Sequence, residues 1–286
     1  MRSFWTIFRF SAWRLRWTVL GWGIPLMLLG LITTPFYDLV AENERQLRPV
    51  IQGLKPLVKS FIGGEQAEDL FTPQGFLALR YFAFLPVILG IFASVVGSGM
   101  LASDEERGIL DFLLAHPAGR SSVFLGRLAA TFLTMVAILL LAWFGLWLGV
   151  LRAESLNFPP GQILLPYISV LAVGTFFLTL SLALSMTMPS RVTAAMTAGF
   201  IVLAGEILTN LAKAIMELKL AAKFSPLTYF QTNAMSGLEI KPLMGLLAFA
   251  IIWTVLAWLG FQRRDIRVAG DGGWKLPFLG RKNRIN

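Results

Sequence analysis

The chain has 286 residues, of which 56% are hydrophobic and only 14% are charged. A water-soluble domain carries about a quarter charged residues, so this composition excludes an ordinary soluble protein. The sequence has no cysteine and one histidine, His116, which excludes disulfides, thiolate nucleophiles, cysteine-based zinc sites and paired-histidine metal sites. We therefore expect no catalytic residue, no resident cofactor and no bound metal.

Six apolar runs are each long enough to cross a bilayer, for which about 20 residues suffice. They cover residues 18–36, 81–101, 123–151, 161–187, 192–211 and 242–261. The first run is too long for a signal-peptide core and lacks a small-residue cleavage site, so we expect it to remain as a helix. The sequence thus predicts an all-α, polytopic membrane protein with its transmembrane domain over 18–261.

The basic residues predict the orientation of these spans. The connections on the outer side hold equal numbers of basic and acidic residues, so the formal net charge of +9 lies on the side that holds both termini. Because basic residues near span ends stay in the cytoplasm, we predict that both termini and the basic tail over 262–286 are cytoplasmic. A basic face against anionic lipid explains the net charge without nucleic acid.

Residues 1–17 are predicted to form an amphipathic helix that lies in the membrane interface. Its two faces separate basic from apolar residues, with Arg2, Arg9 and Arg16 on one and Phe4, Phe8 and Leu15 on the other. Such a helix buries its apolar face among the lipid headgroups. Arg14 breaks the pattern and is expected to snorkel. The alternative is a frayed basic leader to the first span.

Two connections on the outer side show helical apolar spacing. In residues 47–62 the pattern is interrupted by Pro49 and Pro56, and in residues 206–224 Lys213 and Glu217 form an i,i+4 pair on the polar face. We interpret both segments as interfacial or re-entrant helices at the outer mouth. They either gate the translocation path or pack on the bilayer surface.

The connection between the second and third spans holds the most informative pattern. Ser103 and Glu106 are spaced as a capping box, and Pro117 is a stop signal, so we predict a short helix over 103–117. Ser121 or Ser122 can cap the next helix. One face of the short helix has anchors at helical spacing, namely Ile109, Phe112, Leu113 and His116. This face either packs on lipid and neighbouring spans or docks into the groove of a cytoplasmic partner.

This loop closely resembles a motif of the type 2 permease subunits of ATP-binding cassette (ABC) exporters. The matching residues are Glu105, Glu106, Gly108, Leu110, Leu113, Leu114, Pro117 and Arg120. Ile109 stands where the motif has threonine, which leaves the apolar face intact. The likeness continues over 124–127, in Ser225-Pro226 and over 261–266, so it covers nearly the whole chain.

The resemblance implies that the segment 103–117 is a coupling helix seated in an ATPase subunit. The implied contact residues are Glu105, Glu106, Arg107, Gly108, Ile109, Phe112, Leu113, His116, Pro117 and Arg120. The chain lacks the G-x-x-x-x-G-K-[ST] loop that cradles nucleotide phosphates, so ATP and magnesium are expected in two copies of a partner ATPase. A second permease, identical or paralogous, completes the complex that the resemblance implies in a bacterial or archaeal inner membrane.

The spans themselves contain few polar groups. No charged residue lies mid-span, which argues against a proton- or sodium-driven carrier and favours an amphipathic or lipid-like cargo. The fourth span has hydroxyls that bind either cargo or their own backbone, namely Thr175, Thr179, Ser181 and Ser185. The fifth has two small-xxx-small pairs, Ala194 with Ala198 and Ala195 with Gly199, which suit a permease dimer contact or packing within the chain.

The leading functional hypothesis is therefore the permease subunit of an ABC exporter, without enzymatic activity of its own. A membrane-embedded lipid-modifying enzyme is one alternative, for which Asp104 to Glu106 would be the only acidic cluster. A non-transporting accessory or sensor subunit is the other.

Overall fold

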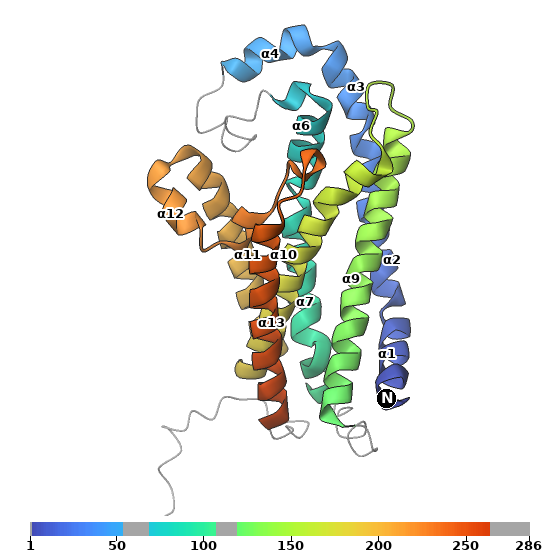
Figure 1. Cartoon of the computed structure of the whole chain (residues 1–286), viewed down its shortest axis with the longest axis vertical. Helices are drawn as coiled ribbons and strands as arrows, with labels where there is room; N and C mark the ends of the chain where they lie inside the picture. The colour runs from blue at the N-terminus through green and yellow to red at the C-terminus, as the bar shows by residue number, and fades with distance from the viewer. Residues whose placement is uncertain (1, 54–68, 107–118, 264–286) are drawn as a thin grey trace, which may run out of the picture.

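In the part of the chain that the structure describes, six helical segments, each long and apolar enough to cross a membrane, run side by side in an elongated bundle (Figure 1). They are Arg16–Glu42, Pro73–Asp104, Arg120–Val150, Pro160–Thr187, Arg191–Lys213 and Ile240–Arg263. The computed structural model describes residues 2–53, 69–106 and 119–263, and no strand occurs in these ranges. The all-α class and the six predicted spans are confirmed.

The first half of the chain forms α1 (Arg2–Arg14), α2 (Arg16–Thr33), α3 (Pro35–Glu42), α4 (Glu44–Gln52), α6 (Pro73–Leu77), the π-helical turn η2 (Ala78–Phe82) and α7 (Leu85–Glu106). The second half forms α9 (Arg120–Val150), α10 (Pro160–Thr187), α11 (Arg191–Ala214), η3 (Met216–Leu218), α12 (Lys219–Ala222), η4 (Pro226–Tyr229), η5 (Ala234–Ser236) and α13 (Ile240–Arg263). Proline opens α3, α6 and α10, where its missing N–H costs no helical hydrogen bond.

The central helices are α7 and α10, and the others pack around them. In the most apolar 18-residue stretch of α10, 67% is buried inside the chain, against 22% in the corresponding stretches of α11 and α13. The pair α2 and α9 approach closely because glycine faces the partner backbone on both sides. A Cβ on Gly30 would lie 2.8 Å from the Leu146 nitrogen, and one on Gly145 would overlap the Met27 carbonyl. Small residues of this kind permit tight helix contact in a membrane, where burial of apolar surface does not drive helices to associate.

We call the end of the bundle that holds α1, the last turn of α7, the first turns of α9 and α11 and the last turn of α13 the basal end, and the opposite end the apical end. Figure 1 shows the basal end at the bottom. The main core of aromatic and aliphatic side chains, including Tyr81, Phe92 and Phe177, fills the bundle above it. A smaller core around Phe124 and Phe261 closes the basal end.

The predicted N-terminal helix forms as α1, and it packs lengthwise on the first turns of α9. Phe4 and Ile7 meet α9 at Gly126, where a Cβ would lie 3.1 Å from the Ile7 side chain. Leu15 separates α1 from α2, but its amide still bonds to the Ser11 carbonyl. The aromatic residues Trp5, Trp13 and Trp17 are exposed. The position of α1 in the membrane interface stays a prediction.

At the apical end the outer segments differ from their predicted forms. Residues 206–214 continue the fifth span within α11, and the helix ends because Ile215 adopts an extended backbone. The predicted i,i+4 pair of Lys213 and Glu217 is therefore wrong, and Lys213 donates to Asn210 instead. In the other segment Pro49 lies inside α4, which ends at Gln52. Residues 54–62 of the predicted 47–62 helix lie outside the described residues.

Candidate functional site

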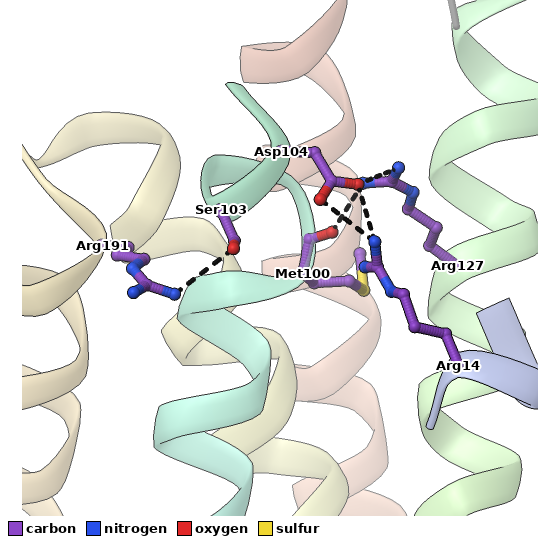
Figure 2. A network of polar contacts seen from close by, with 6 residues as sticks. All are labelled: Arg14, Met100, Ser103, Asp104, Arg127 and Arg191. Carbon is purple, nitrogen blue, oxygen red and sulfur yellow. Dashed lines mark hydrogen bonds and ion pairs between the residues drawn. The ribbon is translucent and has the colours of Figure 1, made fainter. Parts of the chain in front are cut away.

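The last turn of α7 places a buried carboxylate between two arginines from other helices (Figure 2). Asp104 is 1% exposed, and its two oxygens accept hydrogen bonds of 3.1 and 3.2 Å from Arg14 Nη1 of α1. Arg127 of α9 forms an ion pair with the same carboxylate. The other amino group of Arg127 donates to the Met100 carbonyl at 2.9 Å. This cluster ties α7 to both α1 and α9.

The Asp104 carboxylate and the two guanidiniums that it pairs with stabilise each other. A carboxylate at a helix C-terminus is opposed by the helix dipole, and a buried guanidinium loses its hydration. Direct ion pairing offsets both costs, since charge-assisted hydrogen bonds are the strong ones. The predicted helix over 103–117 would place Asp104 in its first turn, but α7 continues through Glu106, so Asp104 lies in the last turn of α7 instead. Arg14, which was expected to snorkel, pairs with Asp104.

A third arginine reaches α7 from the start of α11. Arg191 Nη1 donates to the Ser103 hydroxyl at 3.3 Å, and Figure 2 shows it on the opposite side of α7 from Arg127. Ser190 and Thr193 cap α11 reciprocally and so position the arginine. The predicted capping box of Ser103 and Glu106 is therefore wrong, because Ser103 lies inside α7. A local spacing rule could not detect that the preceding span continues through it.

The start of α9 is held by the end of α13. Arg120 Nη1 donates to the carbonyls of Phe261 and Gln262 at 3.2 and 3.0 Å. A cation at these last-turn carbonyls complements the helix C-terminus. The Ser121 hydroxyl accepts from Trp258 Nε1 at 3.2 Å and from Gln262 Nε2 at 2.8 Å. The predicted capping of α9 by Ser121 or Ser122 is wrong, since Gly119 precedes the helix without a side-chain cap.

The structure thus fixes both ends of the segment that carries the predicted coupling helix. Glu105 and Glu106 belong to the last turn of α7, and Arg120 opens α9. The predicted contact residues from Arg107 to Pro117 lie outside the described residues, and their roles stay predictions. Arg120 was predicted to contact an ATPase, and its contacts with α13 are an additional role that the sequence did not indicate.

Sequence reasoning missed the pairing of Arg14, Asp104 and Arg127. Two irregularities could have indicated it. Arg14 stands on the wrong face of an amphipathic helix, and Arg127 lies within an otherwise apolar span. An ionisable residue that is costly where it stands usually has a partner.

Polar groups deeper in the bundle serve helix packing. Thr175 and Thr179 donate to carbonyls of α10 itself, as does Ser185. Ser181 instead donates to the Ser94 carbonyl of α7 at 2.6 Å. The alternative that the hydroxyls bond their own backbone is therefore confirmed for Thr175, Thr179 and Ser185, whereas Ser181 bonds the backbone of another helix. Two buried tyrosines add a cross-link between spans, because the Tyr167 hydroxyl donates to that of Tyr81 at 2.8 Å.

The small residues of α11 divide between two directions. Ala194 and Ala198 are completely buried inside this chain, on the helix that packs against α7, so they are not available to a second permease. Ala195 and Gly199 are partly exposed, and a Cβ on Gly199 would meet nothing within 4 Å. A dimer contact through Ala195 and Gly199 stays a prediction.

An open cavity of about 630 Å³ lies at the apical end between α3, α4 and the span of α6 and η2. Most of its lining is apolar, with Phe36, Leu47 and Phe76 as examples, and Arg80, Asn43 and Gln46 add polar groups. Such a lining fits an amphipathic molecule. Across residues 2–53, 69–106 and 119–263, no three His, Cys, Asp or Glu side chains gather in a way that could hold a metal ion.

Comparison with known protein families identifies the family of the chain. Residues 14–266 match the sequence pattern of the family described as "ABC-2 family transporter protein". No curated protein sequence matches the chain. The family match spans all six membrane helices, both anchored ends of the loop and the cluster of Arg14, Asp104 and Arg127. The chain therefore belongs to the ABC-2 transporter family, whose members are membrane permeases of ABC transporters.

Proposed function

We propose that this permease is the membrane subunit of an ATP-driven exporter that moves an amphipathic or lipid-like substrate out of the cell. Hydrolysis takes place in two copies of a separate cassette ATPase, which also supply the ATP and magnesium sites. A second permease, identical or paralogous, completes the complex in the cytoplasmic membrane. In this arrangement the basal end and both termini face the cytoplasm.

One observation carries the proposal: both ends of the connection between α7 and α9 are anchored to other helices. At one end Asp104 binds α1 and α9, and at the other Arg120 binds α13. A force applied to the connection is therefore transmitted to four helices instead of being absorbed by a loose loop. This is what a permease without its own nucleotide site requires from its coupling segment.

The substrate class rests on the apical cavity. Its largely apolar lining, to which Arg80 and two amide side chains add polar groups, suits a molecule with a fatty part and a polar part. Asp104, which belongs to the acidic cluster that a lipid-modifying enzyme would use, is buried and paired with two guanidiniums. That pairing leaves it unsuited to general acid–base chemistry.

A photo-crosslinker at position 112 in the full chain tests the partner. After irradiation of native membranes, mass spectrometry is expected to identify a cassette ATPase, whereas a crosslinker at the apical residue Asn43 captures none. Capture of only lipid or unrelated proteins at position 112 would contradict the proposed coupling role.

Reconstitution tests the activity. The permease and the captured ATPase are placed in vesicles with a fluorescent lipid, and its ATP-dependent movement is followed. Changing Phe112 and Leu113 together to Asp is expected to abolish this movement, because two charges cannot enter an apolar groove. The control Asp111→Asn lies on the opposite face by helical spacing and is expected to retain it.

A further inference from the structure

A small cavity at the basal end lies between α1, α7, α9 and α11. Its volume is about 170 Å³, and three guanidinium groups line it, those of Arg14, Arg127 and Arg191. The hydroxyl residues of the lining are Ser11, Ser103 and Thr131, and no carboxylate belongs to the described lining. The cavity therefore presents positive charge and hydrogen-bond donors to any molecule that enters it.

The carboxylate of Asp104 balances only part of the positive charge beside it. Arg14 and Arg127 share this one carboxylate, and Arg191 donates to the Ser103 hydroxyl. Arg127 is 3% exposed and Asp104 is 1% exposed, so this part of the cluster is shielded from water. An anion in the cavity would balance the second guanidinium of the pair Arg14 and Arg127.

The shape of the cavity depends on Gly99 of α7. A Cβ at this position would meet only Arg191 Nη1, at 4.0 Å, so the missing side chain leaves the space open. Towards the membrane interior the lining becomes apolar, with Leu15, Val95 and Val96. Val95 is 56% exposed, which opens this side of the cavity towards the lipid.

The aromatic residues of the adjoining helices indicate the depth of the cavity. Trp13 and Trp17 flank the cavity residues Arg14 and Leu15 in sequence and are both exposed. The Arg16 guanidinium lies over the Trp13 ring, 3.7 Å from its centre. Tryptophan and arginine on a membrane helix mark the headgroup level, so the basic part of the cavity lies where lipid phosphates lie.

We propose that this cavity binds the phosphate headgroup of an anionic phospholipid. Arginine is suited to phosphate because its planar guanidinium donates two parallel hydrogen bonds. The acyl chain leaves along the apolar side at Val95. Inorganic phosphate shares the headgroup chemistry, but it makes no use of the apolar opening. A bound lipid would hold α1, α7 and α11 together at the level of the charged cluster.

The test uses the full chain, purified in detergent and stripped of lipid. Native mass spectrometry follows its titration with phosphatidylglycerol, and separately with phosphatidylcholine. The anionic lipid is expected to bind at least about tenfold more tightly, because a charge-assisted hydrogen bond contributes about 1.5 to 3 kcal/mol. Gly99→Leu fills the cavity without removing an arginine and is expected to weaken binding about tenfold.

The matched control is Gly21→Leu on α2, where a Cβ meets nothing within 4 Å; this variant is expected to bind like the unchanged chain. Arg191→Gln is a second variant, which is expected to weaken binding because it removes a positive charge. It replaces Gly99→Leu in the test if that variant does not fold. Thermal unfolding in detergent checks the fold of each variant.

Two results would overturn the proposal. One is equal phosphatidylglycerol binding by the unchanged chain and by both Gly99→Leu and Arg191→Gln. The other is displacement of the lipid by inorganic phosphate at a similar concentration, which would assign the cavity to a free anion.

Discussion

Arg14 and Asp104 lie 90 residues apart in the sequence, and the guanidinium of the first donates to both carboxylate oxygens of the second. This contact joins the N-terminal helix α1 to the last turn of α7. Arg127 adds the first turns of α9 to the same carboxylate. Helix α7, which leads into the connection between α7 and α9, is thus held by α9, which follows that connection, and by α1.

Asp104→Asn tests the contribution of this cluster to stability. The substitution keeps the size of the side chain but leaves a buried guanidinium without its counter-ion, which costs about 3 kcal/mol or more. We expect a clearly lower midpoint of thermal unfolding in detergent. The control is Glu44→Gln, which breaks the exposed Arg48–Glu44 pair of α4 and is expected to cost less than about 1 kcal/mol. Similar midpoints for the two variants would contradict the structural role of Asp104.

Arg120→Lys tests the anchor on α13. Lysine retains the charge but is a compact point charge without the planar fork of arginine. The two bonds to the carbonyls of Phe261 and Gln262 would therefore weaken, and backbone amides near the end of α13 are expected to exchange hydrogen faster by mass spectrometry. Ser122→Ala, which leaves the contacts of Arg120 and Ser121 in place, is expected to exchange at the original rate. Unchanged exchange in Arg120→Lys would show that the anchor does not hold the helix end.

Gly145→Ala tests the close contact of α2 with α9. The added methyl group would overlap the Met27 carbonyl, so the helices must separate. Forcing extra volume into a packed contact typically costs about 1 to 3 kcal/mol, and the unfolding midpoint is expected to fall. Gly21→Ala is the control, because a Cβ there meets nothing within 4 Å. An equal response of both variants would argue against the tight α2–α9 packing.

The hydrogen bond between Tyr167 and Tyr81 predicts which of the two tyrosines costs more stability when it is replaced by phenylalanine. Tyr81→Phe leaves the buried Tyr167 hydroxyl without its acceptor, which costs about 1 to 3 kcal/mol. Tyr167→Phe leaves Tyr81 still donating to the Ala142 carbonyl at 3.3 Å. The loss of stability is therefore expected to be about 0.6 kcal/mol, which is typical of a hydrogen bond in a membrane protein. Unfolding of the two variants and of the double variant measures this order. A larger loss for Tyr167→Phe would reverse the assigned direction of the bond.

The membrane spans could be predicted because each needs only a long apolar run, and this is a local property of the sequence. The identity of Asp104's partners could not, since Arg14 and Arg127 meet it only when three helices pack together. The same limit explains the error at Ser103, whose spacing to Glu106 fits a helix start although the preceding helix continues through it. At Ile215 the backbone becomes extended and α11 ends, although the apolar stripe continues in the sequence. The spacing of apolar residues therefore did not indicate where this helix ends.

The small residues of α11 show a related limit. Ala194 and Ala195 are neighbours of the same type, and spacing alone made both candidates for a dimer contact. Packing against α7 buries the first and leaves the second partly exposed. The direction of each side chain follows from the rotation of the helix about its axis, which the alanine pattern does not determine.

The crossing of α11 over α7 has a mechanical consequence. At Gly90 a Cβ would lie only 3.0 Å from Val202, so the two helices touch near the middle of α11, whose 24 residues extend about 36 Å. If α11 rotates about this contact as a stiff rod, its Arg191 end and its Ala214 end swing in opposite directions. A displacement that begins at one membrane face would then appear, reversed in sign, at the other face as a movement of α12.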